Sequence, residues 1–204
     1  DDHAIVREGL KQIFALTNDI KVAGEAASGA QLLESVHDRD FDLLLLDMTM
    51  PGISGVDLIT RIRAHRSQLP ILVLSMHTGP HIVRRTLKAG ASGYLAKETV
   101  PEILIAAIKK IAAGGRFIDP VLAEQIVFNT EESGQDQPHS QLSDRELQIL
   151  HSLVRGKSVS EIADALAISN KTVSTHKANL MQKMGFKTNA DLIIYGLSHS
   201  LFAQ

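Results

Sequence analysis

Four consecutive leucines at positions 43–46 run directly into Asp47, and a Met-Thr-Met-Pro-Gly turn follows. A strand that is apolar at every position is typical of a parallel sheet that helices cover on both faces. Three further short apolar runs alternate with stretches of helical periodicity, which predicts an α/β domain. The predicted strands are residues 20–26, 42–46, 70–75 and 92–96, and the predicted helices are residues 4–16, 29–38, 54–65, 79–89 and 100–113.

Polar side chains follow the ends of these strands. Asp47 and Ser75 end two of them, Lys97 follows the last, and the pair Asp1 and Asp2 precedes the first helix. Chemistry in open parallel sheets takes place beyond the carboxyl ends of the strands. Clustered carboxylates repel one another unless a cation joins them, and Mg²⁺ takes oxygen ligands. The pattern predicts a Mg²⁺ site at which Asp47 attacks a phosphoryl group whose oxygens face Lys97 and Ser75.

Composition narrows the class of protein. The chain has 204 residues, 44% of them hydrophobic, which is enough for two modest cores. It contains no cysteine, so disulfides, thiolate metal sites and cysteine nucleophiles are excluded. No apolar run approaches the roughly 18 residues of a membrane span, and no signal peptide opens the sequence. We therefore expect a cytoplasmic protein that does not bind membranes.

A polar stretch divides the chain. Residues 129–141 read NTEESGQDQPHSQ, without an aliphatic or aromatic residue, which predicts a linker. Just before it, residues 119–128 read as a short helix with Asp119 as N-cap and Pro120 at the first position. Residues 1–141 carry 14 Lys and Arg against 18 Asp and Glu, a net charge of −4, whereas the remainder carries 7 against 5, a net charge of +2. We expect a first domain at residues 1–116, a linker with a short helix at 117–141, and a second domain at 142–204.

The second half predicts four short helices. Ser143 and Glu146 have the spacing of a capping box, and helices at 158–168, 169–184 and 188–199 follow the one that begins there. A three-residue turn between the second and third helices indicates a helix-turn-helix. Residues 169–184 contain no acidic residue, and Val173, Leu180 and Met184 share the face opposite a stripe of small polar side chains. Such a stripe suits the edges of bases in the major groove of DNA.

The acidic pair, "LLLLDMTMPGISG", "PILVLS" and "GYLAKE" resemble, in this order, the receiver domain of two-component response regulators. The resemblance implies a flavodoxin-like fold with a five-stranded parallel sheet in the order 2-1-3-4-5, whose first strand would precede Asp1 and is absent from this sequence. It also implies that a histidine kinase transfers a phosphoryl group to the aspartate of the leucine-rich strand. The implied roles are phosphoacceptor for Asp47; Mg²⁺ ligands for Asp2 directly, Asp1 through water, Asp47, and Thr49 through its main-chain carbonyl; phosphoryl contacts for Ser75 and Lys97; and switch aromatic for Tyr94.

The second half resembles the LuxR-type DNA-binding domain of the NarL/FixJ class of response regulators, through "LSDRELQIL" and "SVSEIADALAISNKTVSTHKANLMQKMG". The implied partner is double-stranded promoter DNA. A homodimer after phosphorylation is also expected, and RNA polymerase is a further candidate partner. By position, Ser174, Thr175 and Ala178 would face bases, and Lys171, Thr172, Lys177, Asn179 and Lys183 would face phosphates.

Two other classes compete with this reading. Haloacid-dehalogenase-like phosphatases also place a nucleophilic aspartate after an apolar strand, but they carry a second aspartate two residues later, where this chain has Thr49. We therefore do not expect an enzyme. A DNA-binding regulator with a degenerate receiver that works without phosphorylation stays open as the alternative.

Overall fold

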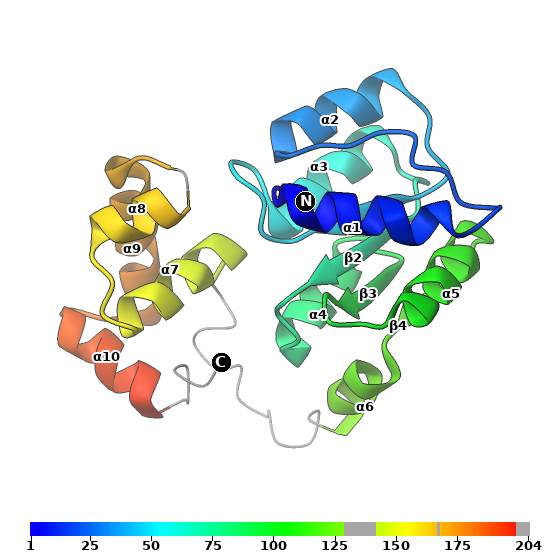
Figure 1. The fold of residues 1–204 in the computed structure, drawn as a ribbon. Coiled ribbons are helices and arrows are strands. Elements are labelled where there is room, and N and C mark those ends of the chain that lie inside the picture. The colour runs from blue at the N-terminus through cyan, green and yellow to red at the C-terminus, as the bar shows by residue number, and fades with distance from the viewer. Residues whose placement is uncertain (129–141, 167, 199–204) are drawn as a thin grey trace. The chain divides into compact units, whose positions relative to one another are not determined.

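The computed structural model describes residues 1–128, 142–166 and 168–198 (Figure 1). For residues 127, 128, 144 and 197 it describes the backbone alone. The chain divides into two units, Asp1–Glu132 and Ser133–Gln204. The polar stretch 129–141, predicted to be a linker, lies outside the described residues. Within the described part of the chain, no helix is both long enough and apolar enough to cross a membrane.

The first unit is built on a parallel sheet, as predicted. Its strands follow one another in space in the order β1 (Leu44–Asp47), β2 (Ile71–Ser75), β3 (Gly93–Ala96) and β4 (Phe117–Ile118). The helices that precede, connect and follow these strands are close to their predicted bounds. They are α1 (Ala4–Ala15), α2 (Gly29–Asp38), α3 (Gly55–His65), α4 (Pro80–Lys88), α5 (Pro101–Ala112) and α6 (Pro120–Phe128).

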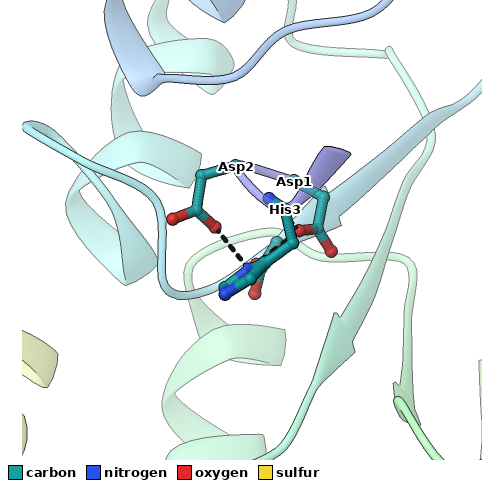
Figure 2. Close-up of side chains that lie close together, drawn as sticks. Asp1, Asp2 and His3 are labelled. Carbon is teal, nitrogen blue, oxygen red and sulfur yellow. Dashed lines mark hydrogen bonds and ion pairs between the residues drawn. The ribbon is translucent and has the colours of Figure 1, made fainter. Parts of the chain in front are cut away.

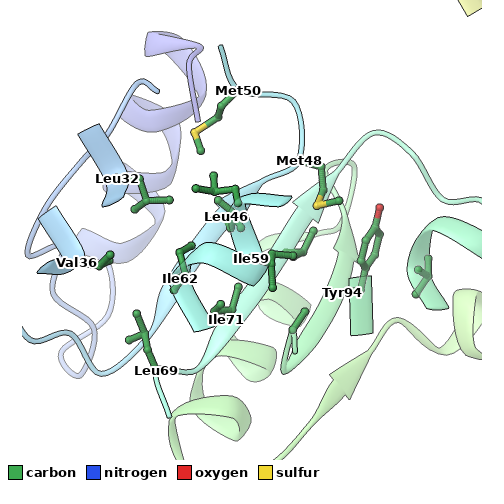
Figure 3. Close-up of a cluster of buried hydrophobic side chains, with 14 of the residues drawn as sticks. Leu32, Val36, Leu46, Met48, Met50, Ile59, Ile62, Leu69, Ile71 and Tyr94 are labelled. Atoms are coloured by element: carbon green, nitrogen blue, oxygen red, sulfur yellow. The ribbon is translucent and has the colours of Figure 1, made fainter. Parts of the chain in front are cut away.

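Helices cover both faces of this sheet, which explains the unbroken apolar strands. On one face, residues of α2, α3 and α4 pack on Leu46, Ile71, Val73 and Tyr94 (Figure 3). On the other face, Phe14 of α1 and the buried residues of α5 pack on the alternate strand positions, among them Leu72, Leu74 and Leu95. Successive strand residues point to opposite faces. Each leucine of the run at 43–46 therefore has an apolar layer to enter.

The prediction of a strand at residues 20–26 is wrong for the structure. This segment has no regular hydrogen-bonded ladder, although the main-chain nitrogen of Asp1 lies 3.4 Å from the carbonyl oxygen of Ala26. A strand needs a hydrogen-bonded neighbour, and no described strand pairs with this segment. A cavity of about 500 Å³ lies between residues 20–26 and β1. Both segments line it, together with α1 and Ile108 of α5. The segment therefore lacks a pairing partner among the described residues.

Residues 117–128, which the sequence assigned to the linker region, pack on the first unit. Phe117 and Ile118 pair with Gly93 and Tyr94 of β3. The predicted N-cap is confirmed, because Asp119 Oδ1 accepts a hydrogen bond from the amide of Val121 at 2.9 Å. Leu122 of α6 is buried in the core beneath α4. A two-residue strand gives too short a pattern to be recognised in the sequence.

The second unit consists of four described helices, α7 (Asp144–Val154), α8 (Val159–Ala165), α9 (Asn170–Met184) and α10 (Asn189–Ser198). Helices α7 and α8 both begin with capping boxes, formed by Ser143 with Glu146 and by Ser158 with Glu161. Helix α9 packs against α7 and α8, and α10 packs against α7. Helix α9 ends at Gly185, whose φ of 69° is the left-handed conformation that glycine adopts at helix ends. The predicted four-helix unit is confirmed.

The guanidinium group of Arg63 stabilises the turn that leads into β3 by hydrogen bonds. Arg63 of α3 donates to the carbonyl oxygen of Gly90 from Nε at 3.0 Å and from Nη2 at 2.7 Å. Its Nη1 donates to the carbonyl oxygens of Leu69 at 2.6 Å and Arg66 at 3.0 Å. Gly90 has a φ of 111°, and a Cβ atom there would lie 2.7 Å from Arg63 Nε. The turn thus needs glycine for both its conformation and its close packing.

We predict that Gly90→Ala destabilises the first unit more than Gly114→Ala. Gly114 also has a positive φ, 83°, but open space surrounds its Cα. Its substitution should cost about 1–2 kcal/mol of unfolding free energy from backbone strain alone. Gly90→Ala should add roughly 1–3 kcal/mol by displacing Arg63. Urea unfolding in a Tyr195→Phe background, where Tyr94 is the remaining tyrosine, measures the difference by fluorescence. Equal losses in the two variants would contradict the proposed role of Arg63.

Candidate functional site

The parallel sheet brings the predicted polar residues of the first unit to one edge. Asp47 is the last residue of β1, Ser75 is the last residue of β2, and Lys97 directly follows β3. Asp1 and Asp2 precede α1 and lie beside Asp47. Parallel strands all end at the same edge of their sheet, so Asp47 and Lys97, which are 50 positions apart in the chain, meet there.

Asp47 is buried, with 3% of its surface exposed, and both of its carboxylate oxygens have hydrogen-bond donors. Lys97 Nζ lies 2.7 Å from Oδ2. The amide and the hydroxyl of Thr49 donate to Oδ1 at 3.1 and 3.0 Å. Three donors therefore hold the two oxygens of this carboxylate in fixed positions.

The ammonium group of Lys97 also joins the acidic pair to this carboxylate. Its Nζ lies 3.0 Å from Asp1 Oδ2, and the Asp1 side chain is 8% exposed. One positive charge therefore lies between two buried carboxylates. This ion pair offsets a repulsion that would otherwise oppose the folded arrangement of the site.

The oxygens of Asp1, Asp2 and Asp47 fit a hard divalent cation. One ligand atom from each, together with one from His3, lies within 4.8 Å of the others. Asp2 Oδ1 is buried and accepts no hydrogen bond among the described residues. A buried carboxylate oxygen without a donor is costly unless a cation satisfies it. The donor set suits Mg²⁺, which the sequence predicted here.

His3 belongs to this cluster, and our sequence reasoning missed it. Its Nδ1 lies 3.0 Å from Asp2 Oδ1 and 3.4 Å from Asp1 Oδ1 (Figure 2). These are ion-pair distances for a protonated imidazole, but the geometry to Asp2 is not that of a hydrogen bond. The side chain is 63% exposed. Its position directly after the acidic pair was the available signal.

Ser75 and Tyr94 are linked through the backbone of one loop residue. Both side chains are fully buried. Ser75 Oγ accepts a hydrogen bond from the amide of His77 at 3.0 Å, and the Tyr94 hydroxyl donates to the carbonyl oxygen of His77. The amide of Lys97 donates to the carbonyl oxygen of Ser75 at 2.9 Å. Ser75 and Tyr94 thus both contact the main chain of His77.

In the second unit, α9 presents the predicted polar stripe. Val173 and Leu180 are buried against the other helices and Met184 is half-buried, as the periodicity predicted. The opposite stripe is exposed, and it contains no acidic residue. Its members are Lys171, Ser174, Thr175, Ala178, Asn179, Gln182 and Lys183.

Three residues expected to face phosphates contact other residues of the unit or are partly buried. Lys183 Nζ lies 2.6 Å from Glu146 Oε2, and Glu146 is 3% exposed. Thr172 shares a hydrogen bond between hydroxyl groups with the N-cap Ser169, and Lys177 is half-buried. Lys171 and Asn179 are exposed.

His176, on the flank of α9, is uncharged at neutral pH. Burial and the nearby charge of Arg145 lower the pKa of His176 below its ordinary value of 6.5. This imidazole therefore does not add to the positive charge of the helix.

The two units match two families. Residues 1–109 match the response regulator receiver domain, and residues 140–195 match the bacterial regulatory proteins of the luxR family. A receiver followed by this helix-turn-helix defines the class of protein. The chain belongs to the response regulators of the NarL/FixJ class.

Individual relatives resemble nearly the whole chain. It is 38% identical to the transcriptional regulatory protein UhpA of Escherichia coli, over 94% of this chain and 92% of that protein. It is 32% identical to the response regulator UvrY of Escherichia coli, over 98% and 93% of the two chains. A solved structure of an RcsB–DNA complex has a TM-score of 0.60 and 29% identity, over 97% of this chain and 95% of that one.

We predict that the Glu146–Lys183 ion pair makes the second unit sensitive to acid. Burial alone would raise the pKa of Glu146, but hydrogen bonds from Lys183 and Ser143 outweigh it and hold this pKa below the ordinary value of 4.5. Because the pKa is depressed in the folded state, its stabilising contribution is present above pH 4.5 and is lost as the pH falls below it. The urea midpoint of a Tyr94→Phe protein, followed by Tyr195 fluorescence, should therefore fall as the pH is lowered below 4.5.

Glu161→Gln is the matched control, because Glu161 forms the same capping box on an exposed surface. Glutamine preserves a capping box. Glu146→Gln should therefore lower the urea midpoint more than Glu161→Gln at pH 7, and the difference should shrink below pH 4.5. Equal midpoints at pH 7 would show that the ion pair contributes nothing.

Proposed function

We propose that this response regulator accepts a phosphoryl group on Asp47 from a histidine kinase and thereby controls its binding to promoter DNA. The observation that carries the proposal is the contact of the buried Asp47 carboxylate with Lys97 and Thr49, beside the acidic pair. An oxygen of Asp47 attacks the phosphorus, and the bond from phosphorus to the kinase imidazole breaks as the new P–O bond forms.

The residues of the site have two roles in this transfer: some would bind Mg²⁺, and others contact the phosphoryl oxygens. Asp2, Asp47 and the main-chain carbonyl of Thr49 would hold Mg²⁺ directly, and Asp1 would act through water. The ion supplies positive charge that offsets the charge on the phosphoryl oxygens. Lys97 exchanges its contact with Asp47 Oδ2 for a phosphoryl oxygen, and the Ser75 hydroxyl turns toward another.

The same exchange would operate the switch. Phosphorylation adds roughly −1.5 to −2 charge at Asp47. Ser75 Oγ accepts a hydrogen bond from the amide of His77, so its own proton is free to be donated to a phosphoryl oxygen. Turning this hydroxyl toward the phosphoryl group would change its contact with His77, whose carbonyl oxygen accepts from Tyr94. Tyr94 is therefore placed to report the state of Asp47, through a shift between two arrangements of this loop.

Helix α9 is the proposed reading element in the major groove of double-stranded DNA. Its exposed stripe lacks acidic residues, and the RcsB structure with DNA supports this assignment. On α10, Ile193 and Ile194 are 42% and 65% exposed, which suits contact with a second copy of the chain. A dimer would double the base contacts of one small unit. Cytoplasmic localisation and contact with RNA polymerase are further parts of the proposal.

We predict that intact mass rises by one phosphoryl group after incubation with a small phosphodonor and Mg²⁺. Asp47→Ala should show no gain, because it lacks the nucleophile. Lys97→Ala should lose most of the gain, since no other cation contacts Asp47 among the described residues. Omitting Mg²⁺ should abolish labelling in the parent protein. Labelling that persists in Asp47→Ala would place the phosphoacceptor elsewhere.

Sedimentation and DNA anisotropy complete this test. Phosphorylated protein should form a dimer and bind DNA more tightly, whereas Asp47→Ala should keep the mass and affinity of the unphosphorylated parent. Identical mass and affinity with and without phosphodonor would favour the alternative, a DNA-binding regulator that works without phosphorylation.

We predict that Lys171 and Lys183 contribute differently to DNA binding. Lys171 is exposed, so Lys171→Ala should reduce the slope of log affinity against log salt concentration by about one unit. Lys183 is paired with Glu146, so Lys183→Ala should change this slope less and should lower the urea midpoint of the second unit. A full unit of slope lost in Lys183→Ala would show that its ammonium group leaves Glu146 to bind phosphate.

A further inference from the structure

The centre of the exposed face of α9 carries no charge. We call five of its residues the reading stripe, and all five are exposed. Lys171 and Lys183 lie at its two ends, and Lys177 is half-buried on its flank. Helix α9 contains no arginine. The reading stripe consists of Ser174, Thr175, Ala178, Asn179 and Gln182.

Two methyl groups lie next to each other on this stripe. Thr175 Oγ1 donates its proton to the carbonyl oxygen of Lys171 at 2.9 Å, within the helix. The side chain therefore offers its methyl group, and an oxygen that can only accept. Ala178 follows three residues later, a spacing that makes two side chains neighbours on a helix surface. The middle of the stripe is thus an apolar patch with amides beside it.

These groups match one type of base pair. A methyl group packs on the C5-methyl group of thymine, and an asparagine or glutamine amide pairs with adenine. Guanine is most often read by arginine or lysine, which the middle of the stripe lacks. We propose that this stripe reads A·T pairs, with Thr175 and Ala178 against thymine methyl groups and Asn179 or Gln182 against adenine. The inference rests on the proposed role of α9 in DNA binding.

Removing single methyl groups from the DNA tests the inference. The full-length chain, phosphorylated, is first used to select binding sites from random duplexes, and each thymine of the selected site is then replaced by uracil. Uracil lacks only the C5-methyl group. Loss of one buried methyl contact should weaken binding about fourfold at the contacted positions. Unchanged affinity for every uracil substitution, or a selected core made of G·C pairs, would overturn the proposal.

Two variants of Thr175 assign the contact to one side chain. Thr175→Ser keeps the hydroxyl group and its hydrogen bond to Lys171 but loses the methyl group, so it should no longer distinguish thymine from uracil at one position. Thr175→Val keeps a methyl group without the hydroxyl, so it should retain the fourfold difference. Thr175→Ser retaining full discrimination at all positions would exclude Thr175 as the reader. Circular dichroism melting checks that both variants fold.

The selection step also separates this inference from the proposed function. If no sequence is enriched and the protein binds no DNA, the role of α9 itself fails. If a sequence is enriched and bound but methyl groups have no effect, DNA binding stands and the A·T reading is wrong.

Discussion

The ion pair between Lys97 and Asp47 is the interaction on which the proposed chemistry of the first unit depends. It joins a lysine that follows β3 to a buried carboxylate at the end of β1. The same lysine also contacts the carboxylate of Asp1. A carboxylate cluster at this depth is unstable without such a counter-charge. In the proposed transfer, the same lysine exchanges Asp47 for a phosphoryl oxygen. One ammonium group therefore serves both the resting structure and the proposed transfer.

In the second unit, the ion pair between Glu146 and Lys183 positions a helix. Glu146 closes the capping box of α7 and binds Lys183 near the end of α9. The C-terminal end of the proposed reading helix is thus held to the cap of a neighbouring helix, and the five residues of the reading stripe take no part in this ion pair. The residues that position α9 are thus different from those proposed to read bases.

Particular elements show how far the sequence could be read. The helices were predictable because caps such as Ser143 and prolines such as Pro101 and Pro120 mark where helices begin. The segment 20–26 was predicted to be a strand from its composition, yet strand formation depends on a hydrogen-bonded neighbour. Phe117 and Ile118 form a strand although two residues carry no periodic pattern, since pairing with β3 defines them.

The sequence by itself determined the parallel sheet with its chemistry beyond the strand ends, the helix-turn-helix, and the acidic, lysine and hydroxyl residues of the site. These features follow from local order along the chain: unbroken apolar runs, polar residues after each run, and helix caps. Only the tertiary structure decided that His3 joins the acidic pair, that Lys183 is held by Glu146, and that residues 117–128 pack on the first unit. Each of these contacts joins groups from different elements or depends on the path of a turn, so a periodic pattern could not specify it.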